Sequence, residues 1–87
     1  MPFGRPAWIV VLATPDGFRQ SIRTVDGGLV CGKLPGLPVD AAEVLVLETA
    51  AAMVRELGTE FHGEVLDVVW EADSAPGYWR GQVRQRS

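Results

Sequence analysis

The chain has 87 residues, of which 47% are hydrophobic and 22% charged, and its formal net charge at pH 7 is −3. This composition is typical of a folded globular protein, and the length suits one hydrophobic core, so we predict a single domain over residues 1–87. The longest uninterrupted apolar run, residues 7–13, is far shorter than the roughly 20 residues of a membrane-spanning helix, which argues against a membrane protein.

The first part of the chain predicts three antiparallel strands joined by tight turns. Residues 7–13 are continuously apolar and rich in β-branched side chains, as in a central strand covered on both faces. Residues 14–17, Thr-Pro-Asp-Gly, have the chemistry of a turn. Residues 18–25 alternate between apolar and polar side chains, a second turn follows at residues 26–28, and residues 29–34 form the third predicted strand.

Residues 39–57 predict the one long helix. Asp40 and Glu43 have the D-x-x-E spacing of a capping box, and Gly58 is placed to end the helix. One arc of the helical wheel is apolar and is expected to face the sheet; it contains Val46, Leu47, Ala50, Met53, Val54 and Leu57. Val44 and Leu45 lie outside this arc, and an exposed apolar pair of this kind predicts self-association, as a homodimer.

The last part of the chain predicts two more strands, at residues 64–73 and 78–83, with turn residues between them. The predicted order is therefore β-β-β-α-β-β. It indicates an α+β fold with a mainly antiparallel sheet and one long helix packed on one face. Trp8 and Trp70 are expected in the core, on the two strands predicted to be central, and the last strand is expected at the edge of the sheet.

The last strand also carries candidate interaction residues, which are Tyr78, Trp79, Arg80 and Arg84. Aromatic and arginine side chains anchor protein interfaces, and they also stack on nucleic-acid bases. Alternation predicts that Trp79 packs inward while Tyr78 and Arg80 point outward. Residues 40–73 carry a net charge of −8 and residues 74–87 a net charge of +3. This division argues against nucleic acid and favours a protein partner or the acidic part of a second copy.

Part of the chain, residues 7–74, resembles the beginning of a ribonuclease H-like domain. Three hairpin-connected strands precede a helix with an acid in its first turn, in AEVLVLETAAAMVREL, and a strand ending in VVWEADS follows. The resemblance implies divalent metals held between three acids, which here would be Asp16, Glu43 and Asp73. Asp16 stands in a turn and a fourth acid is missing, so we expect a non-catalytic relative in which three oxygen ligands hold Mg²⁺ weakly at most. The capping box is the alternative role for Glu43.

Two further motifs bear on function. The tripeptide at residues 34–36, Leu-Pro-Gly, between the strands and the helix is similar to a segment of HicB-type antitoxins and implies a toxin-neutralising role. Cys31 and His62 form a possible nucleophile and base, but no third group accompanies them, so thiol catalysis is not expected. No phosphate-binding loop or metal-ligand spacing is present, and we expect no cofactor.

The sequence therefore favours a small non-enzymatic protein-interaction or accessory protein that forms a homodimer. The alternative is a nucleic-acid-associated protein on a degenerate ribonuclease H-like or HicB-antitoxin-like scaffold. The lone cysteine fits a reducing compartment, and no signal-peptide pattern opens the chain, so we expect a cytoplasmic protein. The bias toward Arg over Lys, with many Ala, Gly and Val, is typical of a GC-rich bacterial genome.

Overall fold

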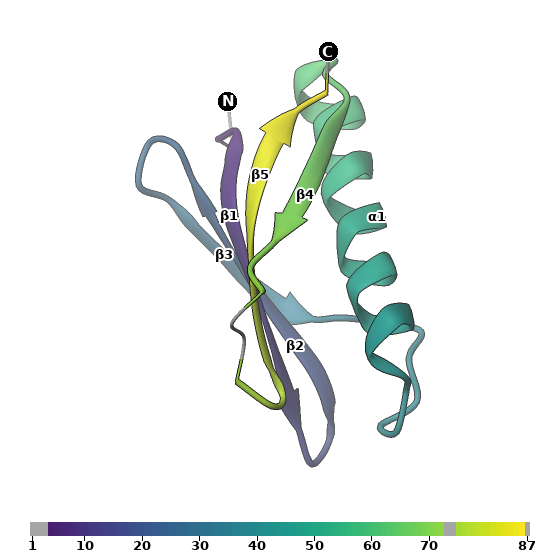
Figure 1. The fold of residues 1–87 in the computed structure, drawn as a ribbon. Helices are drawn as coiled ribbons and strands as arrows, with labels where there is room; N and C mark the ends of the chain where they lie inside the picture. Colours follow the sequence, from purple (N-terminus) through teal and green to yellow (C-terminus); the bar gives the residue numbers. More distant parts are fainter. Residues whose placement is uncertain (1–3, 73–74, 87) are drawn as a thin grey trace.

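The computed structural model describes residues 4–72 and 75–86, which form five strands and one helix. In chain order these are β1 (Pro6–Thr14), β2 (Gly17–Thr24), β3 (Leu29–Lys33), α1 (Glu43–His62), β4 (Leu66–Trp70) and β5 (Tyr78–Gln85). All neighbouring strands are antiparallel, in the spatial order β3-β2-β1-β5-β4, and α1 lies along one face of the sheet (Figure 1). The predicted α+β class and the predicted order of elements are confirmed.

The expected position of the last strand is wrong. β5 lies inside the sheet between β1 and β4, and β4 is the edge strand. A Cβ at Gly81 of β5 would come within 2.9 Å of the Trp70 ring and closer still to Val68, so the absent side chain leaves room for these two residues of β4. In the sheet register, Gly81 has Ile9 opposite it on β1 and Trp70 opposite it on β4. The alternating sequence predicts a hairpin but does not distinguish its inner strand.

The core lies between α1 and the face of the sheet that it covers. The fully or nearly fully buried apolar side chains are Ile9, Val11, Phe18, Ile22, Leu34, Val46, Ala50, Val54 and Leu66. On α1, three of these belong to the arc predicted to face the sheet, and Met53 and Leu57 pack beside them. The helical periodicity therefore predicts the packed face of α1 correctly.

The expected ends of the helix are wrong. α1 begins at Glu43, and its N-cap residue is Ala42, without a side-chain cap, so the predicted capping box does not form. Gly58 lies buried inside α1, where a Cβ would stand 2.7 Å from Cγ of Leu66. The helix ends instead at Gly63, which adopts the left-handed conformation (φ 61°). Tertiary packing on Leu66 thus explains a glycine that the sequence pattern assigns to a helix end.

The other face of the sheet is open. Within the described residues no helix or strand lies over it (Figure 1). The prediction that β1 is covered on both faces is therefore wrong for this side. Trp8 belongs to the open side, because Ile9 and Val11 occupy the core side of β1, and its placement in the core is also wrong. Trp70 does pack against the core, from the edge strand β4.

Within the described residues, α1 is the one helix, and although it is long enough to cross a bilayer, it is not apolar enough to do so.

Candidate interaction surface

Strand alternation places a set of aromatic, aliphatic and basic side chains on the side of the sheet away from α1, which we call the open sheet face. Strand pairing brings positions from all five strands onto it. Its members are Trp8, Val10, Leu12, Arg19, Ser21, Arg23, Leu29, Cys31, Lys33, Asp67, Val69, Tyr78, Arg80, Gln82 and Arg84. Half-exposed antiparallel sheets usually direct polar residues to solvent, so the large apolar side chains here are unusual.

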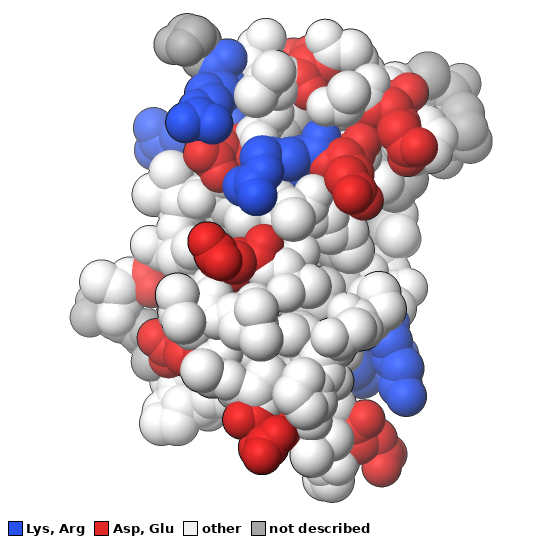
Figure 2. Space-filling view, turned by 90° about the vertical axis from the view of Figure 1, so that its right-hand side faces the viewer, with Lys and Arg blue, Asp and Glu red and all other residues white. Residues whose placement is uncertain are grey.

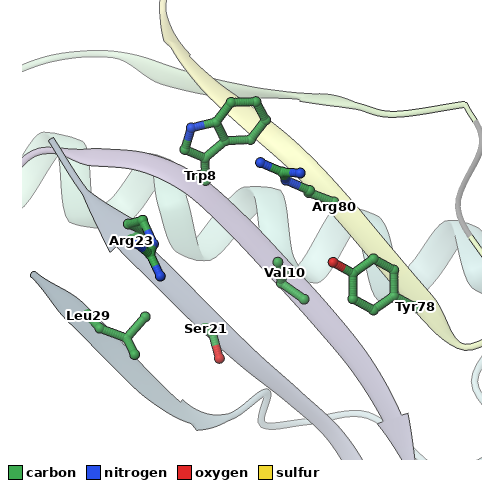
Figure 3. Close-up of a pocket in the computed structure, with 7 residues that line it drawn as sticks. All are labelled: Trp8, Val10, Ser21, Arg23, Leu29, Tyr78 and Arg80. Atoms are coloured by element: carbon green, nitrogen blue, oxygen red, sulfur yellow. The ribbon is translucent and has the colours of Figure 1, made fainter. Parts of the chain in front are cut away.

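A shallow hollow of about 350 Å³ lies in the open sheet face. It is lined by Trp8, Val10, Ser21, Arg23, Leu29, Tyr78 and Arg80 (Figure 3). Val10 on the central strand β1 is paired with Ser21 of β2 on one side and with Arg80 of β5 on the other. The two arginines of the lining, Arg23 and Arg80, therefore stand on opposite sides of β1, with Trp8 and Val10 of β1 between them (Figure 3).

The arginines of this face are held differently. The guanidinium carbon of Arg80 lies 4.3 Å from the centre of the Trp8 ring, within the range of a cation–π contact. Its Nε also lies 3.9 Å from a carboxylate oxygen of Glu71, at the limit of an ion pair. Arg84 donates a hydrogen bond of 3.0 Å to Gln82. Among the described residues, by contrast, Arg23 forms no ion pair.

The open sheet face is basic although the chain is acidic. Five of the eight lysine and arginine residues of the chain lie on it. The nearby acids of β4 and its end already face arginines. Asp67 bridges to Arg55 of α1 at 3.6 Å, and Glu71 faces Arg80. The net positive charge of this face is therefore not balanced locally.

The side of the molecule that carries α1 has the opposite character. Figure 2 shows acidic side chains scattered over this side amid a broad uncharged surface, with basic side chains near the upper end and at one lower edge. On α1 itself, Glu48, Glu56 and Glu60 are exposed. The exposed acids of α1 therefore lie on the opposite side of the fold from the cations of the open sheet face.

The last-strand candidates divide between the two faces as the alternation predicts. Tyr78 and Arg80 point to the open side, and Trp79 points toward the core. The centre of the Trp79 ring lies 6.2 Å from that of Phe18, and its Nε1 donates a hydrogen bond of 3.2 Å to Oε2 of Glu43. The carboxylate of Glu43 therefore joins the start of α1 to β5. A role in partner binding stays a prediction for Tyr78, Trp79, Arg80 and Arg84.

The second predicted contact surface, at the start of α1, is exposed as expected. Val44 is 70% exposed and Leu45 is 46% exposed. Val44 borders a groove of about 410 Å³ between α1 and the edge strand β4, where Leu47 and Trp70 also line the wall. Leu45 lies outside this groove. Self-association through these residues stays a prediction.

The acids of the possible metal site are not brought together in the described residues. Asp16 is exposed in the turn between β1 and β2, and Glu43 accepts from Trp79. Asp73 lies outside the described residues. Within residues 4–72 and 75–86, no three acidic, histidine or cysteine side chains are grouped so that they could hold a metal ion.

Cys31 and His62, the possible nucleophile and base, lie on different sides of the sheet. Cys31 is exposed on β3, where its Sγ accepts a long hydrogen bond of 3.5 Å from the Ser21 hydroxyl. His62 is the last residue of α1, on the other side of the sheet. The two side chains are therefore not arranged as nucleophile and base.

The topology also bears on the two resemblances. A ribonuclease H-like sheet needs a parallel crossover, whereas every neighbouring pair of the described strands is antiparallel. In HicB-type antitoxins another strand usually separates the Leu-Pro-Gly segment from the helix. Here the chain passes from residues 34–36 through turns to α1, with no strand among the described residues of that connection. No protein-family model, curated protein or solved structure matches this chain.

Several residues of this face, notably Trp8, Arg23 and Leu29, escape sequence reasoning. The sequence does contain a signal for Arg23, because the alternation of residues 18–25 places Arg19 and Arg23 on the face of the strand away from Phe18 and Ile22. Trp8 gives no such signal, since it stands in a run of apolar residues where either face could be buried.

Proposed function

We propose that this protein is a non-enzymatic interaction protein that binds a partner through its open sheet face. The observation that carries the proposal is the mixture of arginine, aromatic and aliphatic side chains exposed there. Leu29 is 59% exposed and Leu12 41%, beside Trp8 and Tyr78. Interfaces are enriched in aromatic and arginine residues, and exposed apolar patches mark contact sites.

The chemistry of the hollow supports binding over catalysis. Its polar groups are the guanidinium groups of Arg23 and Arg80 and the hydroxyl groups of Ser21 and Tyr78. No carboxylate, imidazole or thiol group is among the residues that line it. A general base within hydrogen-bonding reach of a bound substrate is therefore missing from the lining, whereas cations and apolar surface for holding a ligand are present.

Site-specific photocrosslinking in the native host would test this proposal. A crosslinking amino acid at Leu29 or Leu12 reports on the open sheet face, and the same amino acid at exposed Glu56 of α1 is the matched control. We expect one discrete adduct from the sheet positions and none of that mass from the helix position. Adducts that form from Glu56 alone would contradict the proposal.

We further propose that the protein forms a homodimer through the start of α1. Support comes from the exposure of Val44 and Leu45 and from the apolar part of the groove beside Val44, whose lining also includes three acids, Glu43, Glu48 and Asp67. The edge strand β4 adds to it, because Asp67 is the one charged residue among its residues 66–70 and they include no lysine or proline to protect the sheet edge. A second copy would cover these apolar surfaces.

The dimer is tested by sedimentation of the wild type and of Leu45→Glu and Val44→Glu. We expect both substitutions to shift a dimer toward monomer without unfolding it. Val25→Glu is the matched control, since Val25 is 67% exposed in the turn between β2 and β3. A wild-type protein that sediments as a monomer at high micromolar concentration would exclude the dimer.

The proposed place of action is the bacterial cytoplasm. The exposed Cys31 supports it, because a free surface thiol suits a reducing compartment. Thiol labelling in intact and lysed cells of the host would test it, and a Cys31 that is modified by a membrane-impermeant reagent in intact cells would contradict it.

A further inference from the structure

We infer that the open sheet face binds an acidic segment of a partner protein that also carries apolar side chains, and that a carboxylate of this segment lies in the hollow between Arg23 and Arg80. The inference rests on the proposed function and names the chemistry of the partner. It follows from charge complementarity, from the geometry of the two arginines and from the aliphatic residues around them.

Charge selects an acidic partner. Arg19, Arg23 and Lys33 lie on β2 and β3, and within the described residues none of them forms an ion pair. A partner that brought further cations to this face would leave like charges in contact, and a neutral partner would leave the cations unpaired as water was excluded. A segment with several carboxylates satisfies them.

Geometry places one of these carboxylates in the hollow. Arg23 and Arg80 stand on β2 and β5, which are separated by β1, so that their backbones lie on the order of 10 Å apart. Both side chains line the same hollow, and Arg80 extends toward Trp8, the residue opposite Arg23 on β1 (Figure 3). The contact with Trp8 holds Arg80 in place before binding, so less side-chain freedom is lost when it pairs.

The apolar residues select protein over nucleic acid. Leu12, Leu29 and Val69 are exposed on this face, and aliphatic side chains give bases no ring to stack on. One side of the Trp8 ring is already occupied by Arg80. A peptide segment with leucine- or phenylalanine-like side chains between its acids fits both parts of the surface.

Selection of short random peptides displayed on phage, with the wild-type protein as bait, would test the inference. We expect the enriched sequences to combine Asp or Glu with an adjacent large apolar residue. The best of them, made synthetically and labelled, is then titrated by fluorescence anisotropy, and its affinity should fall as salt is added. Enrichment of sequences that lack acidic residues would overturn the inference.

Charge-matched variants locate the site. Arg23→Glu should lower the affinity for the labelled peptide by about tenfold or more. Arg55→Glu, the same change on α1, should alter this affinity by less than about twofold. Arg23→Gln gives the same direction with a smaller effect and serves if Arg23→Glu fails to fold. Equal losses in Arg23→Glu and Arg55→Glu would overturn the site, because they would reflect net charge alone.

An oligothymidylate titrated in parallel separates the macromolecule classes. Tighter binding of this probe than of the peptide, with loss in Arg23→Glu, would overturn the inference in favour of single-stranded nucleic acid. The proposed function would survive that result, because the open sheet face would still be the binding surface. Crosslinks from Glu56 alone would instead remove the proposed function and this inference together.

Discussion

The guanidinium group of Arg80 on β5 stacks on the ring of Trp8 on β1, although the two residues are not paired in the sheet register. Trp8 is opposite Gln82, and Arg80 is opposite Val10, so the contact runs diagonally between neighbouring strands. Long side chains make such diagonal contacts. The pair fixes one cation of the open sheet face above apolar surface, where it is ready to meet an acidic group.

A double-mutant cycle on this pair should give a measurable coupling. Arg80→Ala alone should lower the free energy of unfolding by less than roughly 1 kcal/mol, as exposed substitutions do. Combined with Trp8→Ala, it should show a coupling of about 0.5–1 kcal/mol in denaturant titrations, the range of a solvent-exposed cation–π contact. Strictly additive effects would mean that the contact contributes nothing to stability.

Trp79 should be the most sensitive aromatic residue of the last strand. Its ring packs on Phe18 and its Nε1 donates to Glu43, so Trp79→Ala should lower the free energy of unfolding by about 3 kcal/mol. Trp79→Phe keeps much of the packing but loses the hydrogen bond to Glu43, so it should lower the free energy of unfolding by about 1 kcal/mol. Tyr78→Ala, the adjacent outward residue, is the control and should cost less than roughly 1 kcal/mol. A tolerated Trp79→Ala would contradict the inward assignment.

Gly58→Ala should destabilise the protein, although alanine is the better helix former. In an open helix this change stabilises by about 1 kcal/mol. Here the new Cβ would stand 2.7 Å from Leu66 Cγ and 2.9 Å from the carbonyl oxygen of Glu64, so α1 and the chain that follows it must separate. Thr59→Ala, one residue on and exposed, is the control and should not lower the melting temperature. A more stable Gly58→Ala would show that the contact relaxes freely.

The sequence predicts the strands and the helix of this fold better than it predicts which of them lie side by side. Alternation in residues 18–25 and the apolar arc of α1 identify buried faces, because burial imposes a period of two or of 3.6 residues. The edge position of β4 and the role of Gly58 could not be predicted in this way. Both depend on contacts between segments distant in sequence, in which the small size of Gly58 and Gly81 matters more than their freedom of conformation.

The candidate surface was accessible to sequence reasoning only in part. Tyr78 and Arg80 are predicted correctly to point outward, because Trp79 and Val83 mark the inner side of the same strand. Their companion Trp8 is not, since a tryptophan in an apolar run is indistinguishable from a core residue. The arginine that covers it comes from β5, and only the strand order brings the two together.

The start of α1 should respond to a designed cap. Ala42 has the extended backbone of an N-cap residue (φ −65°, ψ 147°) but no side chain that can accept from the first turn. Ala42→Asp should therefore raise the free energy of unfolding by about 1 kcal/mol, from the new cap and its charge near the helix N-terminus. Asp40→Ala should change it by less than about 0.5 kcal/mol, since Asp40 lies two residues before the observed cap. A larger loss of unfolding free energy in Asp40→Ala would indicate that Asp40 caps the helix after all.

Asp26 should make the stability of the β2–β3 turn depend on pH. Its carboxylate accepts hydrogen bonds from the Thr24 hydroxyl and from the backbone N–H of Gly28, and the first of these contributes most to a lowered pKa of Asp26. A carboxyl whose pKa is lower in the folded than in the unfolded protein stabilises the fold above its unfolded pKa, and this contribution is lost as the pH falls through the folded pKa.

Asp26→Asn should therefore melt at a lower temperature than the wild type near neutral pH, and the difference should shrink as the pH falls through the lowered pKa of Asp26 in the folded protein. Circular dichroism melts over this pH range measure it. Asp16→Asn, in the turn between β1 and β2, is the matched control, because no hydrogen bond to its carboxylate is present within the described residues. A melting difference for Asp26→Asn that stays constant down to acid pH would assign the effect to the shape of the turn and not to the ionised carboxylate.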